Sequence, residues 1–193
     1  MRLIVLAAIS LALLSCGGGS GATTGSATLT GSTIGGQAIV PHDAIAANIS
    51  FSANGPGHAA LIGITSASGV CSMLLSGKEP KSTQVLSLTA FRLQPDFSAA
   101  PPPAAGTYFV GALAIENAVA LFAATDATCR NLSPPGVVQA SSGTVTFTSV
   151  GNRYAGSFDL FFGFGEHVTG TFDAPVCPGL TELAEGNPTL ACQ

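Results

Sequence analysis

Apolar and polar residues alternate most clearly towards the C-terminal end of the chain. From Tyr154 to Phe162 every second residue is aromatic, leucine or glycine, and the residues between them are mostly small or polar. Residues 168–174 repeat this pattern, and a short loop with two glycines, residues 163–167, joins the two segments. Because strand side chains point alternately to opposite faces of a sheet, a period of two predicts strands with one buried face. We expect the two segments to form an antiparallel hairpin, with residues 143–150 as a third strand beside it.

Shorter runs rich in Val, Ile, Leu, Thr and Phe make up the rest of the chain after residue 26, and Gly, Pro, Asn and Ser separate them. None of these runs has a convincing helical period. A tight turn at Gly35-Gly36 is expected between the first two strands, and residues 41–47 are also compatible with one helical turn. The further strands that the pattern predicts are at residues 27–34, 37–40, 45–51, 59–66, 70–75, 84–91, 107–111 and 118–124.

Many short strands separated by turn residues predict an all-β fold. We expect an antiparallel β-sandwich in one domain over residues 27–193, with a closed or partly open β-barrel as the alternative. Hydrophobic residues make up 47% of the chain, and the 24 glycines and 12 prolines are too many for a helical bundle. A domain of this length buries about 70% of the surface of its unfolded chain, so its core does not depend on disulfides.

Charged residues are scarce, and this limits the possible partners. They form 8% of the chain, against about 25% in a typical globular protein. The chain has 6 basic and 10 acidic residues, a net charge of -4, and no run of basic residues that would attract phosphates. Nucleic acid is therefore excluded as a partner.

The N-terminal residues have the pattern of an exported lipoprotein. Arg2 precedes an apolar run over residues 3–14, as in the charged and apolar regions of a secretory signal. As a helix this run is about 18 Å long, which is too short for a hydrocarbon core of about 30 Å. The run ends in Leu13-Leu14-Ser15-Cys16, which resembles the lipobox of bacterial lipoproteins. In that family the signal is cut before the cysteine, and its thiol carries a diacylglycerol with fatty acyl chains such as palmitate.

We therefore expect a signal peptide over residues 1–15 and a lipid on Cys16. The alternative is that Cys16 lies in or near a conventional cleavage site. Residues 16–26 then form a tether, because Gly17 to Ser26 are almost all Gly, Ser, Ala and Thr, a composition with a root-mean-square reach of about 17 Å for ten residues. More than one acyl chain gives stable membrane attachment.

Residue 17 bears on which membrane holds the protein. It is Gly, whereas lipoproteins retained at the inner membrane tend to have Asp after the lipidated cysteine. The expected location is thus the cell envelope, anchored in the outer membrane of a two-membrane cell, on the periplasmic or the surface face.

Four cysteines remain after Cys16, an even number that suits disulfides in an oxidising compartment. Three connectivities are possible. The pairing we prefer joins Cys71 to Cys129 and Cys177 to Cys192, because the second bond would pin an irregular tail. No Cys-x-x-Cys or His-x-x-x-His spacing occurs, so a metal site is not expected.

The mature chain also contains a series of motifs made of turn glycines, strand aromatics and cysteines. These are Gly31-Ser32-Thr33-Ile34-Gly35-Gly36, Asp43-Ala44, Cys71-Ser72-Met73-Leu74, Gly106-Thr107-Tyr108, Ser142-Gly143-Thr144-Val145, Gly156-Ser157-Phe158-Asp159-Leu160 and Gly170-Thr171-Phe172-Asp173-Ala174-Pro175-Val176-Cys177. Their combination resembles a group of uncharacterised bacterial lipoproteins, over most of the mature chain. The resemblance implies a lipobox signal and an all-β mature domain, and it carries over no activity and no catalytic residue.

The candidates for a catalytic base are His42, His58 and His167, each of which also fits a turn or a loop tip. Asp159 and Asp173 could form a carboxylate pair on neighbouring strands, or could alternate with buried residues on the solvent face. The chain has no G-x-S-x-G, P-loop or H-E-x-x-H motif. We therefore expect no catalytic residue and no cofactor.

The chain has 11 phenylalanines, and Phe161 and Phe164 do not both fit on the inward face of the hairpin. Some aromatic surface is thus expected to be exposed or to line a cavity. The function that the sequence favours is a non-catalytic structural or binding module anchored to the envelope membrane through Cys16. The alternatives are a carrier of a lipid or other apolar ligand in a barrel cavity and an envelope hydrolase.

Overall fold

Strands dominate the computed structural model, which describes residues 24–31, 33–51, 57–94, 101–112, 114–134, 136–186 and 189–193. The expected signal peptide, Cys16 and nearly all of the tether lie outside these residues. The elements are β1 (Ser26–Gly31), β2 (Asp43–Phe51), β3 (Gly57–Thr65), α1 (Val70–Leu75), β4 (Lys78–Glu79), β5 (Gln84–Arg92), β6 (Gly106–Val110), β7 (Glu116–Ala124), β8 (Val138–Gln139), β9 (Ser142–Ser149), β10 (Arg153–Phe161), the 3-10 helix η1 (Gly163–Gly165), β11 (His167–Pro175), α2 (Pro178–Ala184) and β12 (Ala191–Cys192).

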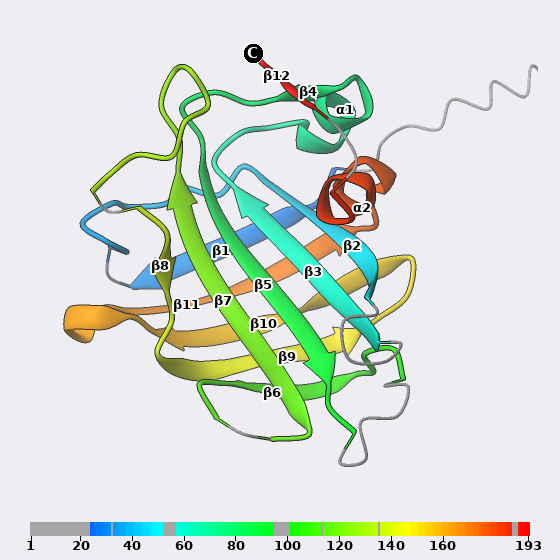
Figure 1. Cartoon of the computed structure of the whole chain (residues 1–193). Helices are drawn as coiled ribbons and strands as arrows, with labels where there is room; N and C mark the ends of the chain where they lie inside the picture. Colours follow the sequence, from blue (N-terminus) through cyan, green and yellow to red (C-terminus); the bar gives the residue numbers. More distant parts are fainter. Residues whose placement is uncertain are drawn as a thin grey trace, which may run out of the picture.

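One large sheet contains ten of these strands, in the order β1-β11-β10-β9-β6-β7-β5-β3-β2, with β8 added beside β7. Neighbours along this path are antiparallel except β6 and β7, which are parallel. Figure 1 shows β7, β5, β3 and β2 as one layer, and β1, β11, β10, β9 and β6 as a second layer that runs across behind it. The sheet therefore wraps almost into a barrel, which confirms the all-β prediction with its sandwich and barrel alternatives.

The hairpin predicted from the alternating pattern is confirmed, with β9 as its third strand. In β10 and β11 the register places Gly156 opposite Phe172 and Gly170 opposite Phe158. A Cβ at Gly170 would lie 2.4 Å from the Phe158 ring, and one at Gly156 would lie 2.9 Å from the Phe172 ring. Each phenylalanine therefore packs across the glycine of the other strand, and both rings are buried as the pattern predicted.

Side chains from both layers fill the space inside the barrel. One continuous cluster of buried apolar residues includes Ile62, Leu88, Phe122, Val145 and Leu160, all with no exposed surface. Around Phe147 the rings of Tyr108, Tyr154 and Phe172 pack edge to face, with centroids 5.4 to 5.6 Å apart. Burial raises the pKa of Tyr108 and of Tyr154 above the usual value for tyrosine.

Two of the predicted strands are wrong. Residues 70–75 form helix α1, in which Val70 and Leu74 are buried together because residues four apart share a helix face. Residues 37–40 pair only through a bridge between Ile34 and Gln37 around the expected Gly35-Gly36 turn, because Ile34 and Ile39 instead pack into the core. The optional helical turn at residues 41–47 is also wrong, since β2 begins at Asp43.

A seam between β2 and the strands β1 and β11 brings the two ends of the sheet together. Asp43 is 2% exposed, and its Oδ1 accepts hydrogen bonds from the amides of Gly25 (3.3 Å) and Ala44 (2.9 Å). The Oδ2 atom accepts one from Val70 at the start of α1, at 3.0 Å. A Cβ at residue 25 would lie only 1.8 Å from the Ala44 carbonyl oxygen, so this close approach requires glycine.

Further along the seam, the amide of Cys177 donates to the Ala46 carbonyl at 2.7 Å, and Ala46 and Val176 form a parallel bridge. The Tyr154 hydroxyl donates to the side-chain oxygen of Asn48. These contacts and the Asp43 carboxylate together hold β2 against the far edge of the sheet.

Replacing the Asp43 carboxylate is predicted to destabilise the domain strongly. Asp43→Ala leaves the buried amides of Ala44 and Val70 and the partly buried amide of Gly25 without their acceptor. We therefore expect the free energy of unfolding in urea to fall by about 3 kcal/mol or more. Asp43→Asn keeps one oxygen and should cost less. As a matched control, Asp159→Ala removes an exposed carboxylate and should change the stability by less than about 1 kcal/mol. Equal effects of Asp43→Ala and Asp159→Ala would contradict the role given to the seam.

Candidate binding site

A second apolar cluster lies outside the barrel, between the outer face of β2 and β3 and the two α-helices. Its buried members are Ile45, Ala47, Val70, Leu74, Cys177 and Leu180. Figure 1 shows α1 and α2 at the end of the sheet where β2 and β3 lie. The helices therefore cover part of an outer sheet face that would otherwise be exposed.

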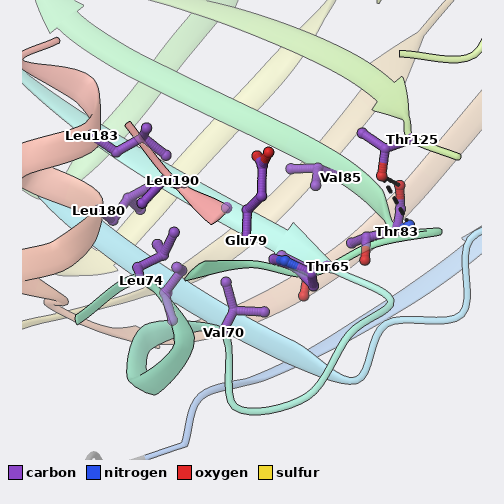
Figure 2. Close-up of a pocket in the computed structure, with 13 residues that line it drawn as sticks. Thr65, Val70, Leu74, Glu79, Thr83, Val85, Thr125, Leu180, Leu183 and Leu190 are labelled. Carbon is purple, nitrogen blue, oxygen red and sulfur yellow. Dashed lines mark hydrogen bonds between the residues drawn. The ribbon is translucent and has the colours of Figure 1, made fainter. Parts of the chain in front are cut away.

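Next to this cluster is a cavity of about 170 Å³, which we call the outer pocket. It is open to solvent on one side, and most of its walls are apolar. Figure 2 shows Leu74, Leu180, Leu183 and Leu190 gathered at one side of it. An apolar cavity of about 150 Å³ is large enough for benzene, so this pocket has room for a six-carbon group. Its lining residues are Ile45, Gly63, Thr65, Val70, Leu74, Glu79, Pro80, Thr83, Val85, Thr125, Leu180, Leu183 and Leu190.

Gly63 on β3 creates part of this space. A Cβ placed there would be 3.7 Å from the Ile45 side chain and 4.0 Å from the Leu180 side chain, which are ordinary contact distances. Neither a close neighbour nor a positive φ therefore requires glycine at this position. A glycine inside a strand weakens the strand and often marks a place where another group approaches closely. Because residue 63 has no side chain, the space above it on the outer face of β3 remains part of the pocket.

Three threonines line another side of the pocket, and each hydroxyl already donates its proton within the protein. Thr65 donates to the Ala67 carbonyl at 2.7 Å, and Thr83 donates to the Lys81 carbonyl at 3.1 Å. Thr125 donates to the Thr83 carbonyl at 3.3 Å and accepts from the Thr83 amide at 3.1 Å. Because these protons are used, the threonines offer a ligand only methyl groups and oxygen lone pairs.

Two disulfides hold the walls of the pocket, and their pairing corrects the predicted one. Cys71 in α1 bonds to Cys177 at the start of α2, and Cys129 after β7 bonds to Cys192 in β12. The predicted pairs, Cys71 with Cys129 and Cys177 with Cys192, are wrong because the fold brings α1 beside α2 and the β7 loop beside β12. In the loop-entropy model the two bonds, which join residues 106 and 63 positions apart, contribute about 4–5 kcal/mol each.

The short strand β12 forms one wall together with β4, and the preceding Leu190 lines the pocket. The amide of Ala191 donates to the Gly77 carbonyl, and the amide of Gln193 donates to the Glu79 carbonyl, both at 2.9 Å.

The loop that carries Cys129 is shaped by Asp126. Its carboxylate accepts hydrogen bonds from the Thr128 hydroxyl and from the amides of Arg130 and Thr128, and these bonds lower the pKa of Asp126 below its usual value.

None of the three histidines lines the outer pocket, although the His42 amide donates to the carbonyl of the lining residue Thr65 at 2.8 Å. His42 precedes β2, whereas His58 lies at the other end of the β2-β3 pair, where its Nδ1 is 3.4 Å from the Ser50 hydroxyl. On β11, the Nε2 atom of His167 is 2.8 Å from an Asp159 oxygen, and the imidazole stacks on the ring of Phe161 at 4.2 Å. Phe161 is 42% exposed, so some aromatic surface is exposed, as predicted.

The two aspartates considered as a carboxylate pair do lie on paired strands but are not opposite each other. Asp159 faces Thr169, and Asp173 faces Ala155 and forms an ion pair with Arg153.

Within the described residues no group of three or more His, Cys, Asp or Glu side chains is arranged to hold a metal. The helices in that same part of the chain are all too short or too polar to span a bilayer. The side chain of Phe164, which the sequence analysis considered together with Phe161, is not among those that the structure describes.

Breaking the Cys129–Cys192 bond is predicted to loosen only the β12 wall. In the double variant Cys129→Ser/Cys192→Ser, we expect the amides of Ala191 and Gln193 to lose protection from hydrogen exchange, because β12 has only two residues paired with β4. The matched variant Cys71→Ser/Cys177→Ser should leave these two amides protected and expose those of α1. Unchanged protection at Ala191 in the first variant would show that the disulfide does not hold this wall.

Comparison of the chain with protein-family models, with curated proteins and with solved structures finds no match.

Proposed function

We propose that this protein is a lipid-anchored envelope protein whose domain is a non-catalytic binding module, and that the outer pocket takes up a small apolar group. The observation that carries the proposal is the pocket itself. Its walls are apolar and open to solvent, its floor lacks a side chain at Gly63, and both disulfides brace it. Apolar surface exposed in this way gains free energy when a ligand removes it from water.

The size of the pocket bounds the affinity for an isolated apolar group. Full burial of a side chain the size of leucine or phenylalanine is worth about 1.5–3 kcal/mol, and a dissociation constant of 1 mM corresponds to about 4 kcal/mol. A six-carbon probe is therefore expected to bind more weakly than 1 mM, with a dissociation constant of about 6–80 mM. Tighter binding requires a ligand that also contacts the rim.

The position of the tether supports a ligand from the membrane environment. Gly25, close to the first described residue, is hydrogen bonded to Asp43, and Asp43 is hydrogen bonded to Val70, which lines the pocket. A tether with a reach of about 17 Å that begins at a lipid on Cys16 would keep the pocket near the bilayer surface. The membrane is then both the anchor and a source of amphiphilic ligands.

The carrier function considered from the sequence placed an apolar ligand inside a β-barrel. In the structure large side chains such as Phe122 and Phe147 pack the barrel interior, whereas the outer pocket is open. A carrier of an apolar molecule would therefore use the outer pocket. The binding module and the carrier then differ only in whether the ligand is later released elsewhere.

The anchor is tested by replacing the lipidated cysteine. Cys16→Ala is predicted to move the protein from the membrane to the soluble fraction and to abolish incorporation of labelled palmitate, because no thiol remains to carry the lipid. Ser20→Ala, a neutral change in the tether, should alter neither. Retention of the Cys16→Ala protein on membranes would refute the proposed anchor.

The pocket is tested by filling it from its floor. Gly63→Leu is predicted to abolish the saturable methyl shifts that 1-hexanol causes at Ile45 and Leu180 in NMR spectra, because the new side chain occupies the space of the ligand. Thr89→Leu adds the same side chain elsewhere on the outer face of the sheet and should leave hexanol binding unchanged. Equal binding by wild type and Gly63→Leu would show that the ligand sits elsewhere.

A further inference from the structure

Glu79 is the acidic residue among those that line the outer pocket. It lies in β4, where its carbonyl accepts the Gln193 amide at 2.9 Å and its register partner is Cys192, so its backbone is fixed. Adjacent strand residues point to opposite faces, and accordingly Lys78 is exposed while Glu79 is half-buried and lines the pocket. Figure 2 shows the Glu79 side chain between Leu190 and Val85.

Most acidic side chains in the described part of the chain have a partner. Glu116 and Asp173 pair with arginines, Asp159 pairs with His167, and Glu166 accepts from the amides of Gly35 and Gly36. Asp43 and Asp126 accept backbone amides, as described above. Among these described acids, Glu79, Glu182 and Glu185 have no such partner, and the last two are exposed, one in α2 and one directly after it.

Among the described acids, Glu79 is thus the partly buried one whose carboxylate has no ion-pair or hydrogen-bond partner. Its neighbours in the pocket, Leu180, Leu190 and Val85, are apolar and supply no proton. Its oxygens keep some contact with water, because neither is among the buried side-chain atoms that lack a partner. A ligand that brings a positive charge to this side of the pocket would give the carboxylate an ion pair and a hydrogen-bond donor.

The other charges near the pocket favour the same sign of ligand. Helix α2, which provides Leu180 and Leu183, contains Glu182, is followed directly by Glu185 and has no basic residue. Lys78 and Lys81 are the cations closest to Glu79 in the chain, and both are exposed and outside the pocket lining. The pocket lining therefore combines apolar walls with one acidic side chain, Glu79, and contains no lysine or arginine.

We infer that the outer pocket binds a cationic amphiphile, with its apolar group of about six carbons against Gly63 and its ammonium group beside the Glu79 carboxylate. This inference rests on the proposed function, because it requires the pocket to be a ligand site, and it adds the chemical class of the ligand. An ammonium group can donate up to three hydrogen bonds, and bonds between ionised groups are stronger than neutral ones.

The experiment compares three six-carbon probes that differ only in their head group: hexylammonium chloride, 1-hexanol and sodium hexanoate. Methyl NMR titrations of the folded protein at low salt give the three dissociation constants. We expect hexylammonium to bind about fivefold more tightly than hexanol, as for a partly exposed ion pair, and hexanoate to bind most weakly. Added 0.5 M salt should reduce the difference between the probes, because salt screens exposed charges.

Glu79→Gln and Glu182→Gln separate the effect of the pocket carboxylate from that of an exposed carboxylate on α2, outside the pocket lining. Glu79→Gln should bring the affinities for hexylammonium and hexanol to the same value, while Glu182→Gln should keep most of the preference. A preference that survives Glu79→Gln, or equal binding of hexylammonium and hexanol by the wild type, would overturn the inference and leave the apolar pocket standing. Failure of all three probes to bind would overturn both the inference and the proposed function.

Discussion

The Asp43 carboxylate is the contact on which the arrangement of this protein depends. Its two oxygens accept hydrogen bonds from amides in three parts of the chain: Gly25 before the first strand, Ala44 in β2 and Val70 at the start of α1. Without this acceptor the buried amides of Ala44 and Val70 would be left unsatisfied. The same group thereby closes the seam of the barrel, fixes where the N-terminal segment leaves the domain, and positions the helix that lines the outer pocket.

The inner and outer faces of the sheet are covered in different ways, and this difference produces a filled barrel and an open outer pocket. The inner faces of both layers bury their aromatic and aliphatic residues against each other, which leaves a filled interior. The outer face of β2 and β3 is covered by two short helices and the β4-β12 pair, which are held by disulfides. Because these elements are short and residue 63 is glycine, the cover leaves a cavity instead of a packed layer.

The sequence predicts those parts of the fold that depend on one strand and its immediate neighbour. The hairpin at Tyr154–Phe162 is recognisable because its period of two follows directly from burying one face. Helix α1 is missed because Val70 and Leu74, four residues apart, share a face in a strand as well as in a helix. The disulfide pairing depends on which distant elements meet, and no pattern near a cysteine contains that information. For the pocket a signal does exist: β3 is apolar on both faces, which indicates a second covering layer. Nothing in the sequence, however, distinguishes Gly63 from any other strand glycine.

The proposed function places the ligand outside the barrel, in the outer pocket. Intermolecular nuclear Overhauser effects between bound hexylammonium and the methyl groups of the protein distinguish this position from the barrel interior. We expect contacts from the hydrocarbon chain to Ile45, Val70 and Leu180, which line the pocket. Contacts to the interior residues Leu88 and Val145 would instead place the ligand inside the barrel and rule out the outer pocket as its site.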